Sequence, residues 1–180
     1  MAVQMLTRTR RIVASMAAVL LVMAGLTSCT PEIKGITGLT MDADGQPLAA
    51  LAWCADRPPD VVLLLAEEDS SSPDPSDVPT PSTNWHWPER RHAVPRDATS
   101  PTTVRLVGFP PGDATDPHAA FRLFGIASNK SFASRSVTFR LAELAGLRPG
   151  SVLITDIVDN DEVQGSIPLD EFARLGRDAC

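Results

Sequence analysis

The sequence predicts a mainly β protein: an antiparallel β-sandwich of about seven strands, with a long Pro/Ser-rich loop and a short C-terminal helix. Three observations support this fold class. Pro (16 residues) outnumbers Gly (11), aromatic residues make up only 5% of the chain, and short apolar runs alternate with turn residues. Each run has the length of one strand, and such strands bury one face against a second sheet. We therefore do not expect a large all-helical protein.

A β-hairpin is predicted at the start of the domain. Residues 33–40 mix β-branched residues with Gly, and residues 48–54 form a second apolar run. Between the two runs, residues 41–47 supply the Asp, Gly and Pro of a tight turn. Residues 61–66 are continuously apolar, which is typical of a strand buried on both faces.

The middle of the chain has a different composition. Residues 67–101 contain seven Pro and six Ser but few aliphatic residues. This composition predicts a long loop or a partly disordered insertion within the single domain.

Further strands and one helix are predicted in the last third of the chain. In residues 136–141, Val137 and Phe139 alternate with Thr138 and Arg140, as in a half-buried strand. Pro168 suits a first helical position, and Gly176 is predicted to close the helix. The face predicted to be buried carries Leu169, Phe172, Ala173 and Leu175. The other predicted strands are residues 102–109, 120–127, 152–158 and 163–167.

The N-terminus has the layout of an export signal. Arg8, Arg10 and Arg11 precede an uncharged apolar stretch at residues 12–26, which is shorter than the ~20 residues that a membrane-spanning helix needs. The segment Leu26-Thr27-Ser28-Cys29 resembles the bacterial lipobox. The resemblance implies a signal peptide at residues 1–28, a lipid anchor on Cys29 with a tether at residues 29–32, and one domain at residues 33–180. The alternative is an ordinary secretory signal with a chance Cys.

Acylation of Cys29 would hold the protein on a membrane, because two or three acyl chains anchor stably. We therefore expect a lipid-anchored protein on the extracytoplasmic face of the cell membrane. Loss of residues 1–28 removes three Arg and no acid, so the net charge changes from −6 to −9. A surface of this charge repels nucleic acid, which we exclude as a direct partner.

The two remaining cysteines predict a disulfide. With Cys29 lipidated, only Cys54 and Cys180 are left, and an exported compartment is oxidising. A redox-active or metal-binding pair is the alternative, although the chain has no CxxC motif.

Two segments resemble a known group of β-sandwich domains. Residues 38–50, with Asp42, Asp44, Gly45 and Pro47, resemble the opening hairpin of carboxypeptidase-regulatory-like domains. Residues 139–153 are similar to the Leu-x-Pro-Gly corner of that group and of fibronectin type III domains. The resemblance implies a prealbumin-like or immunoglobulin-like sandwich, but the Tyr that often follows the corner is missing. The whole layout also resembles lipoproteins of actinobacteria, a resemblance that implies no activity.

Two clusters are candidate ligand sites. Trp85 and Trp87 lie in the polar segment, where they could stack on sugars or anchor a protein partner, or could instead fold back over the edge of the sandwich. Side-chain oxygens of the kind that bind Ca²⁺ are concentrated in the last part of the chain, at Asp156, Asp159, Asn160, Asp161 and Glu162. Because their spacing does not match an EF-hand, a solvated turn is the stronger reading, as it is for the Asp residues of the first hairpin. His86, His92 and His118 lack zinc-ligand spacing and are predicted to be loop residues.

No catalytic motif is present in the sequence. It contains no G-x-S-x-G elbow, H-E-x-x-H, Walker loop or dinucleotide fingerprint. We therefore expect no enzyme, no catalytic residues, no metal and no cofactor. The sequence favours a binding or structural module of the cell envelope, with an envelope protein or a cell-wall glycan as its partner. A hydrolase with dispersed catalytic residues is the weaker alternative.

Overall fold

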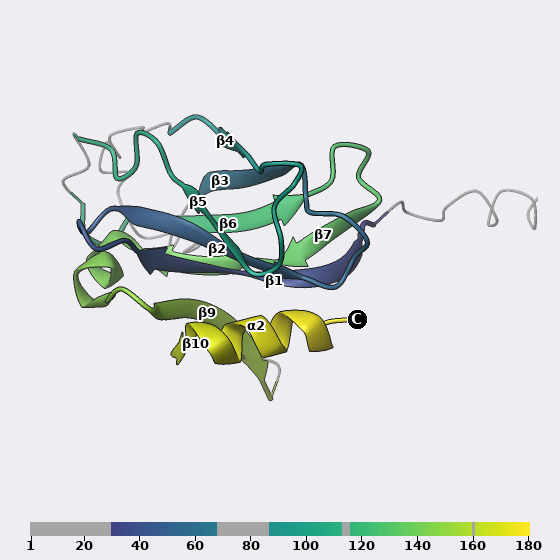
Figure 1. Cartoon of the computed structure of the whole chain (residues 1–180). Helices are drawn as coiled ribbons and strands as arrows, with labels where there is room; N and C mark the ends of the chain where they lie inside the picture. The colour runs from purple at the N-terminus through teal and green to yellow at the C-terminus, as the bar shows by residue number, and fades with distance from the viewer. Residues whose placement is uncertain (1–29, 68–86, 113–115, 160) are drawn as a thin grey trace, which may run out of the picture. The chain divides into compact units, whose positions relative to one another are not determined.

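The described part of the chain forms ten strands and one α-helix (Figure 1). A computed structural model describes residues 30–67, 87–112, 116–159 and 161–180. The strands are β1 (Glu32–Met41), β2 (Pro47–Trp53), β3 (Val61–Glu67), β4 (Arg90–Ala93), β5 (Thr102–Arg105), β6 (Ala120–Ile126), β7 (Phe132–Arg135), β8 (Val137–Arg140), β9 (Ser151–Val158) and β10 (Asp161–Pro168). A 3-10 helix, η1 (Leu141–Gly146), precedes β9, and α2 (Leu169–Asp178) ends the chain.

The strands form one mixed, nearly closed sheet, so the predicted antiparallel sandwich of seven strands is wrong in its details. Strand β1 pairs with β2 along one edge, whereas its other edge pairs first with β7 and then with β9. The β1–β7 pairing is parallel, with Ile33 opposite Ala133. Strand β6 likewise pairs with β3 on one edge and with β7 and β8 on the other. These shared edges make the sheet continuous, because β7 pairs with both β1 and β6.

The first hairpin forms as predicted, and Asp42 explains its turn. Oδ1 of Asp42 accepts hydrogen bonds from the backbone N–H groups of Asp44 (2.9 Å) and Gln46 (2.8 Å). Gly45 adopts a φ of 75°, a conformation that costs Gly little. The side chain of Asp42 therefore closes the turn that sets the β1–β2 register, in which Met41 lies opposite Pro47.

The main core lies inside the curved sheet. Phe109, Phe121 and Phe139 form its aromatic centre, with ring centroids 5.0–5.9 Å apart. Val62 and Leu64 are fully buried there, while Leu63 faces the other side and is also buried. The continuous apolar run at residues 61–66 is thus a strand buried on both faces, as predicted.

Helix α2 covers the outer face of β1 and β2 and forms a second, smaller core. Phe172 and Ala173 are buried in this layer, whereas Leu169 is 39% exposed, contrary to prediction. Pro168 occupies the N-cap position, immediately before the helix, and not the predicted first helical position. Gly176 lies within the helix and does not end it, contrary to prediction. Its role is in packing, because a methyl group on Gly176 would overlap the methyl group of Ala52. The missing side chain lets the helix approach the sheet.

Two strands are additional to the prediction. Strand β4 lies within residues 67–101, which were predicted to be loop, and β7 lies between two predicted strands. Strand β5 ends at Arg105, earlier than predicted, because residues 107–108 turn away. Strands β4 and β7 have only four residues each, which is close to the minimum length of a strand. Such short segments show too few alternating buried and exposed positions to be recognised as strands from the sequence.

Candidate binding site at the open seam of the sheet

The structure describes only part of the sequence-predicted site. Cys29, Trp85 and His86 lie outside the described residues. Cys54 and Cys180, the pair that the sequence singles out, are joined in a disulfide with a Cα–Cα distance of 6.1 Å. This bond ties the end of α2 to the residue that follows β2.

Trp87 lies against the core. Its ring meets the ring of Phe121 edge-on, with centroids 6.4 Å apart, and the guanidinium carbon of Arg90 lies 4.8 Å from the Trp87 centroid. The side chain is half-buried and packs against the main core. Of the two roles considered for this residue, the covering role fits these contacts better than sugar stacking does.

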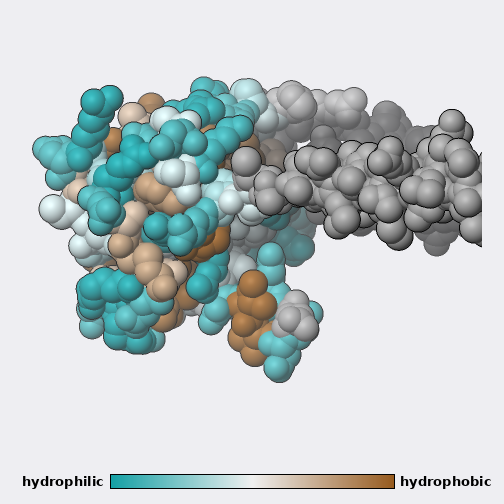
Figure 2. All heavy atoms as spheres, turned by 90° about the vertical axis from the view of Figure 1, so that its right-hand side faces the viewer, coloured by the Kyte–Doolittle hydropathy of each residue, from teal (hydrophilic) through white to brown (hydrophobic). Residues whose placement is uncertain are grey.

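The acidic hairpin between β9 and β10 is exposed. Asp156 pairs with Arg135 at 3.6 Å, and the described residues around it contain no group of three or more metal-ligating side chains. Ile157 and Val158 near the end of β9 are 62% and 50% exposed. Figure 2 shows this end of the hairpin projecting from the body of the domain, with hydrophobic atoms on its surface.

The most distinctive feature is the seam at which the sheet fails to close. Strand β4 stands at one end of the strand order, and β5 ends the branch that leaves β1 through β2. The two strands lie next to each other (Figure 1), but no bridge in the described part of the chain pairs them. A groove of about 490 Å³ runs along this seam, a size that falls within the usual range for ligand sites, roughly 300–1,000 Å³. Its lining comes from Arg91, His92, Ala93 and Pro95 on one side and from Thr103, Val104, Arg105 and Val107 on the other.

Hydrogen bonds at the ends of β4 and β5 show which residues of each strand direct their backbone N–H and C=O groups toward the neighbouring strand. Val94 N–H donates to Asp60 O (3.0 Å), and Leu106 N–H donates to Pro47 O (3.4 Å). In an antiparallel ladder only every second residue bonds to a given neighbour. The backbone groups of Arg91 and Ala93 therefore point away from β3 into the seam. Those of Thr103 and Arg105 point away from β2 into the same seam.

The floor of the groove consists of the inward-facing side chains of these strands. Val104 is 8% exposed and His92 is 9% exposed, with Val62 of the core directly opposite His92. His92 was predicted to be a loop residue, so its place in a strand corrects that expectation. Among the described residues, His92 Nε2 is buried without a hydrogen-bond partner. Burial, and secondarily the nearby Arg90 charge, lowers the pKa of His92, so the neutral imidazole is favoured.

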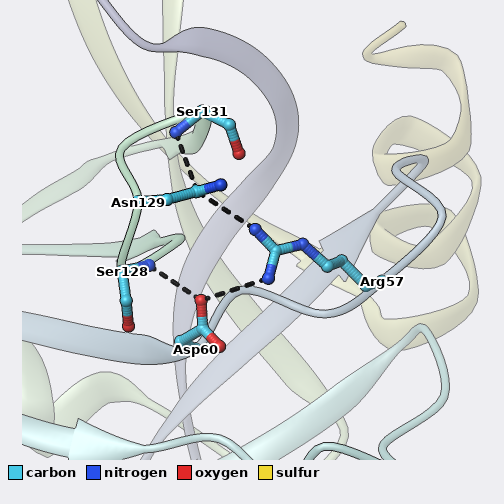
Figure 3. A network of polar contacts seen from close by, with 5 residues as sticks. All are labelled: Arg57, Asp60, Ser128, Asn129 and Ser131. Atoms are coloured by element: carbon cyan, nitrogen blue, oxygen red, sulfur yellow. Dashed lines mark hydrogen bonds and ion pairs between the residues drawn. The ribbon is translucent and has the colours of Figure 1, made fainter.

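A polar network fixes the end of β4 (Figure 3). Asp60 Oδ2 accepts a hydrogen bond from Ser128 N–H (2.7 Å) and lies 3.7 Å from Arg57 Nη1. Arg57 Nη2 also donates to Asn129 Oδ1 at 3.0 Å. Since Asp60 O holds Val94 N–H, this network positions the strand that carries His92.

Two arginines flank the groove. Arg91 pairs with Glu89 at 2.9 Å, and Arg105 pairs with Asp42 at 3.2 Å. Both arginine side chains stay more than half exposed, at 59% and 65%. Exposed pairs of this kind are weak, so an incoming carboxylate can compete for either guanidinium.

Sequence reasoning missed Arg91, Thr103 and Arg105, and it placed His92 in a loop. One signal was available: His92 and Val94 are buried on either side of the exposed Ala93, inside a Pro-rich segment. This alternation was hard to recognise because it covers few residues and because His92, one of the two buried residues, is not hydrophobic.

The arrangement can bind a ligand through main-chain groups and two exposed guanidinium groups. Within the described ranges, no helix is both long enough and apolar enough to cross a membrane. No protein-family model, curated protein or solved structure matches this chain.

Proposed function

We propose that this protein is a binding module of the cell envelope, anchored by lipid on Cys29 and holding a protein partner in the groove between β4 and β5. The groove carries the proposal. It combines two strand edges that no strand of the described part of the chain pairs with and two flanking guanidinium groups.

The anchor is supported by the leader sequence. The lipobox resemblance at Leu26 to Cys29 follows an apolar stretch of signal-peptide length. Replacing Cys29 with Ala should move the protein from the membrane fraction to the soluble fraction. Tight membrane association of Cys29→Ala would contradict the anchor.

A cell-wall glycan is the alternative ligand, through Trp85 and Trp87. Stacking on a sugar needs an accessible aromatic face, whereas Trp87 contacts both Phe121 and Arg90. We therefore favour a protein partner. A hydrolase remains the weakest alternative, because the sequence carries no known catalytic motif.

Site-specific photocrosslinking in cells tests the groove. A photoreactive residue at Val107, which is 70% exposed at the groove rim, should crosslink to a protein. The matched control is Ile157, which is 62% exposed on the β9–β10 hairpin, away from the groove. Crosslinking to peptidoglycan at Val107 would favour the glycan alternative, and equal yields at both positions would contradict a specific site.

A further inference from the structure

We infer that the groove takes an extended acidic peptide, which adds to the sheet as a further strand. This inference rests on the proposed function, because it specifies what the same groove recognises. It follows from three properties of the seam: its backbone edges, the alternation of its side chains and its charge.

The backbone edges are suited to strand addition. Arg91 and Ala93 on β4, and Thr103 and Arg105 on β5, direct their N–H and C=O groups into the groove. An extended peptide satisfies such groups through main-chain hydrogen bonds, whatever its sequence. Closing the sheet in this way also removes edges that would otherwise pair with other chains.

The side chains of the groove alternate in a way that a strand can match. His92 and Val104 face inward and form the floor, while Arg91 and Arg105 face outward on the two sides. Alternate side chains of an added strand point to opposite faces of the sheet. One set would therefore lie on Val104 and His92, and the other set would lie between the arginines.

The charge of the groove indicates which side chains the peptide carries on its outward face. Carboxylates two residues apart share one face of a strand and can reach the exposed guanidinium groups of Arg91 and Arg105. The protein as a whole is negative, but charges farther away than about 8 Å are screened at physiological salt. The local arginines therefore decide the preference, with Glu89 and Asp42 as the competing carboxylates.

A pooled peptide library provides the probe. The library contains acetylated, amidated heptapeptides with two Asp residues separated by one position and mixed residues elsewhere. It is passed over the immobilised full chain carrying Cys29→Ala, and retained peptides are identified by mass spectrometry. Matched libraries carry Asn or Lys in place of both Asp residues. We expect enrichment of the Asp library over the Asn library and none for the Lys library.

Four variants separate the backbone contribution from that of the side chains. Thr103→Pro removes an N–H that points into the seam and not toward β2, so the fold should tolerate it. Its control, Thr103→Ala, removes the side chain but keeps the N–H. Losing a hydrogen bond should weaken retention of the best peptide by about three- to tenfold in Thr103→Pro only. Arg91→Gln and Arg105→Gln should each reduce the preference for Asp over Asn by about two- to fivefold.

The outcomes separate this inference from the proposed function. No enrichment of the Asp library, or equal retention by Thr103→Pro and Thr103→Ala, overturns strand addition by an acidic peptide. In that case, specific crosslinking at Val107 would still leave the groove as a binding site. If Val107 also fails to crosslink, both proposals fall. Unchanged far-ultraviolet circular dichroism in each variant shows that a loss of binding does not reflect unfolding.

Discussion

Gly176→Ala tests how α2 sits on the sheet. In most helices Ala is more favourable than Gly by about 1 kcal/mol, so this substitution would ordinarily stabilise. Here the new methyl group would overlap the Ala52 methyl group and lie 2.9 Å from the Ala52 carbonyl carbon. The obstacle is therefore backbone in β2, which is held between β1 and β5 and cannot easily move.

The two effects can be compared in magnitude. Overpacking a close-packed interior costs about 1–3 kcal/mol, and a backbone obstacle places this site at the upper end of that range. After subtracting the gain in helix propensity of about 1 kcal/mol, we expect Gly176→Ala to lower the free energy of unfolding by roughly 1–2 kcal/mol. For a protein of this size, the expected fall in Tm is about 2–8 °C.

Urea unfolding monitored by tryptophan fluorescence measures this change, and a double-mutant cycle identifies its cause. Ala52→Gly removes the nearest atom, the Ala52 methyl group, and leaves only the backbone contact, so it should cost less in the Gly176→Ala background than in the natural chain. Arg177→Ala, on the exposed side of the same helix, is the control and should change stability by no more than about 0.5 kcal/mol. If Gly176→Ala is as stable as the natural chain, the close contact between α2 and β2 is refuted.

Three further predictions concern the disulfide, the buried histidine and the first turn. Replacing Cys54 and Cys180 with Ser opens a loop of 126 residues and should lower the free energy of unfolding by about 4–5 kcal/mol in the chain-entropy model, measured by urea titration. Because the pKa of His92 is lowered by burial, the unfolded chain binds its proton first, so stability should be full above the ordinary value of 6.5 and fall below it; His92→Gln should flatten this part of the profile of Tm against pH. Asp42→Ala removes two turn hydrogen bonds and should cost about 1–2 kcal/mol in urea unfolding.

Each of these predictions has a control and a contradicting result. Stability of the Cys54/Cys180 variant that equals that of the oxidised protein would mean that the bond contributes nothing. His118→Gln, at an exposed turn position, should keep the pH dependence of the natural chain, and an unchanged profile in His92→Gln would contradict the role of His92. Asp44→Ala keeps the backbone N–H that bonds to Asp42, so a cost equal to that of Asp42→Ala would show that the turn depends on something else.

Local signals in the sequence predicted the elements whose structure is determined locally. The turn at Asp42 to Gln46 depends on hydrogen bonds within five residues, and the alternation of Val137 and Phe139 with Thr138 and Arg140 marks β8 directly. Both features are present in the structure. The predicted helix is also present, although Gly176 acts by packing and not by capping.

Non-local contacts decide what the sequence did not reveal. The parallel alignment of β1 with β7 joins residues about a hundred positions apart, and nothing in either segment specifies it. The groove was missed for a similar reason. In the sequence Arg91 and Arg105 resemble ordinary surface charges, and they flank one site only because the sheet curves round and brings β4 and β5 together.

The position of β1 has a consequence for how the chain folds. The first strand of the domain pairs with three other strands, β2, β7 and β9. Only β2 follows soon in the sequence, whereas β7 and β9 come about a hundred residues later. Contacts of such long range slow folding. A chain emerging from its N-terminus can form the first hairpin early, but it must keep one edge of β1 unpaired until almost the whole domain has appeared.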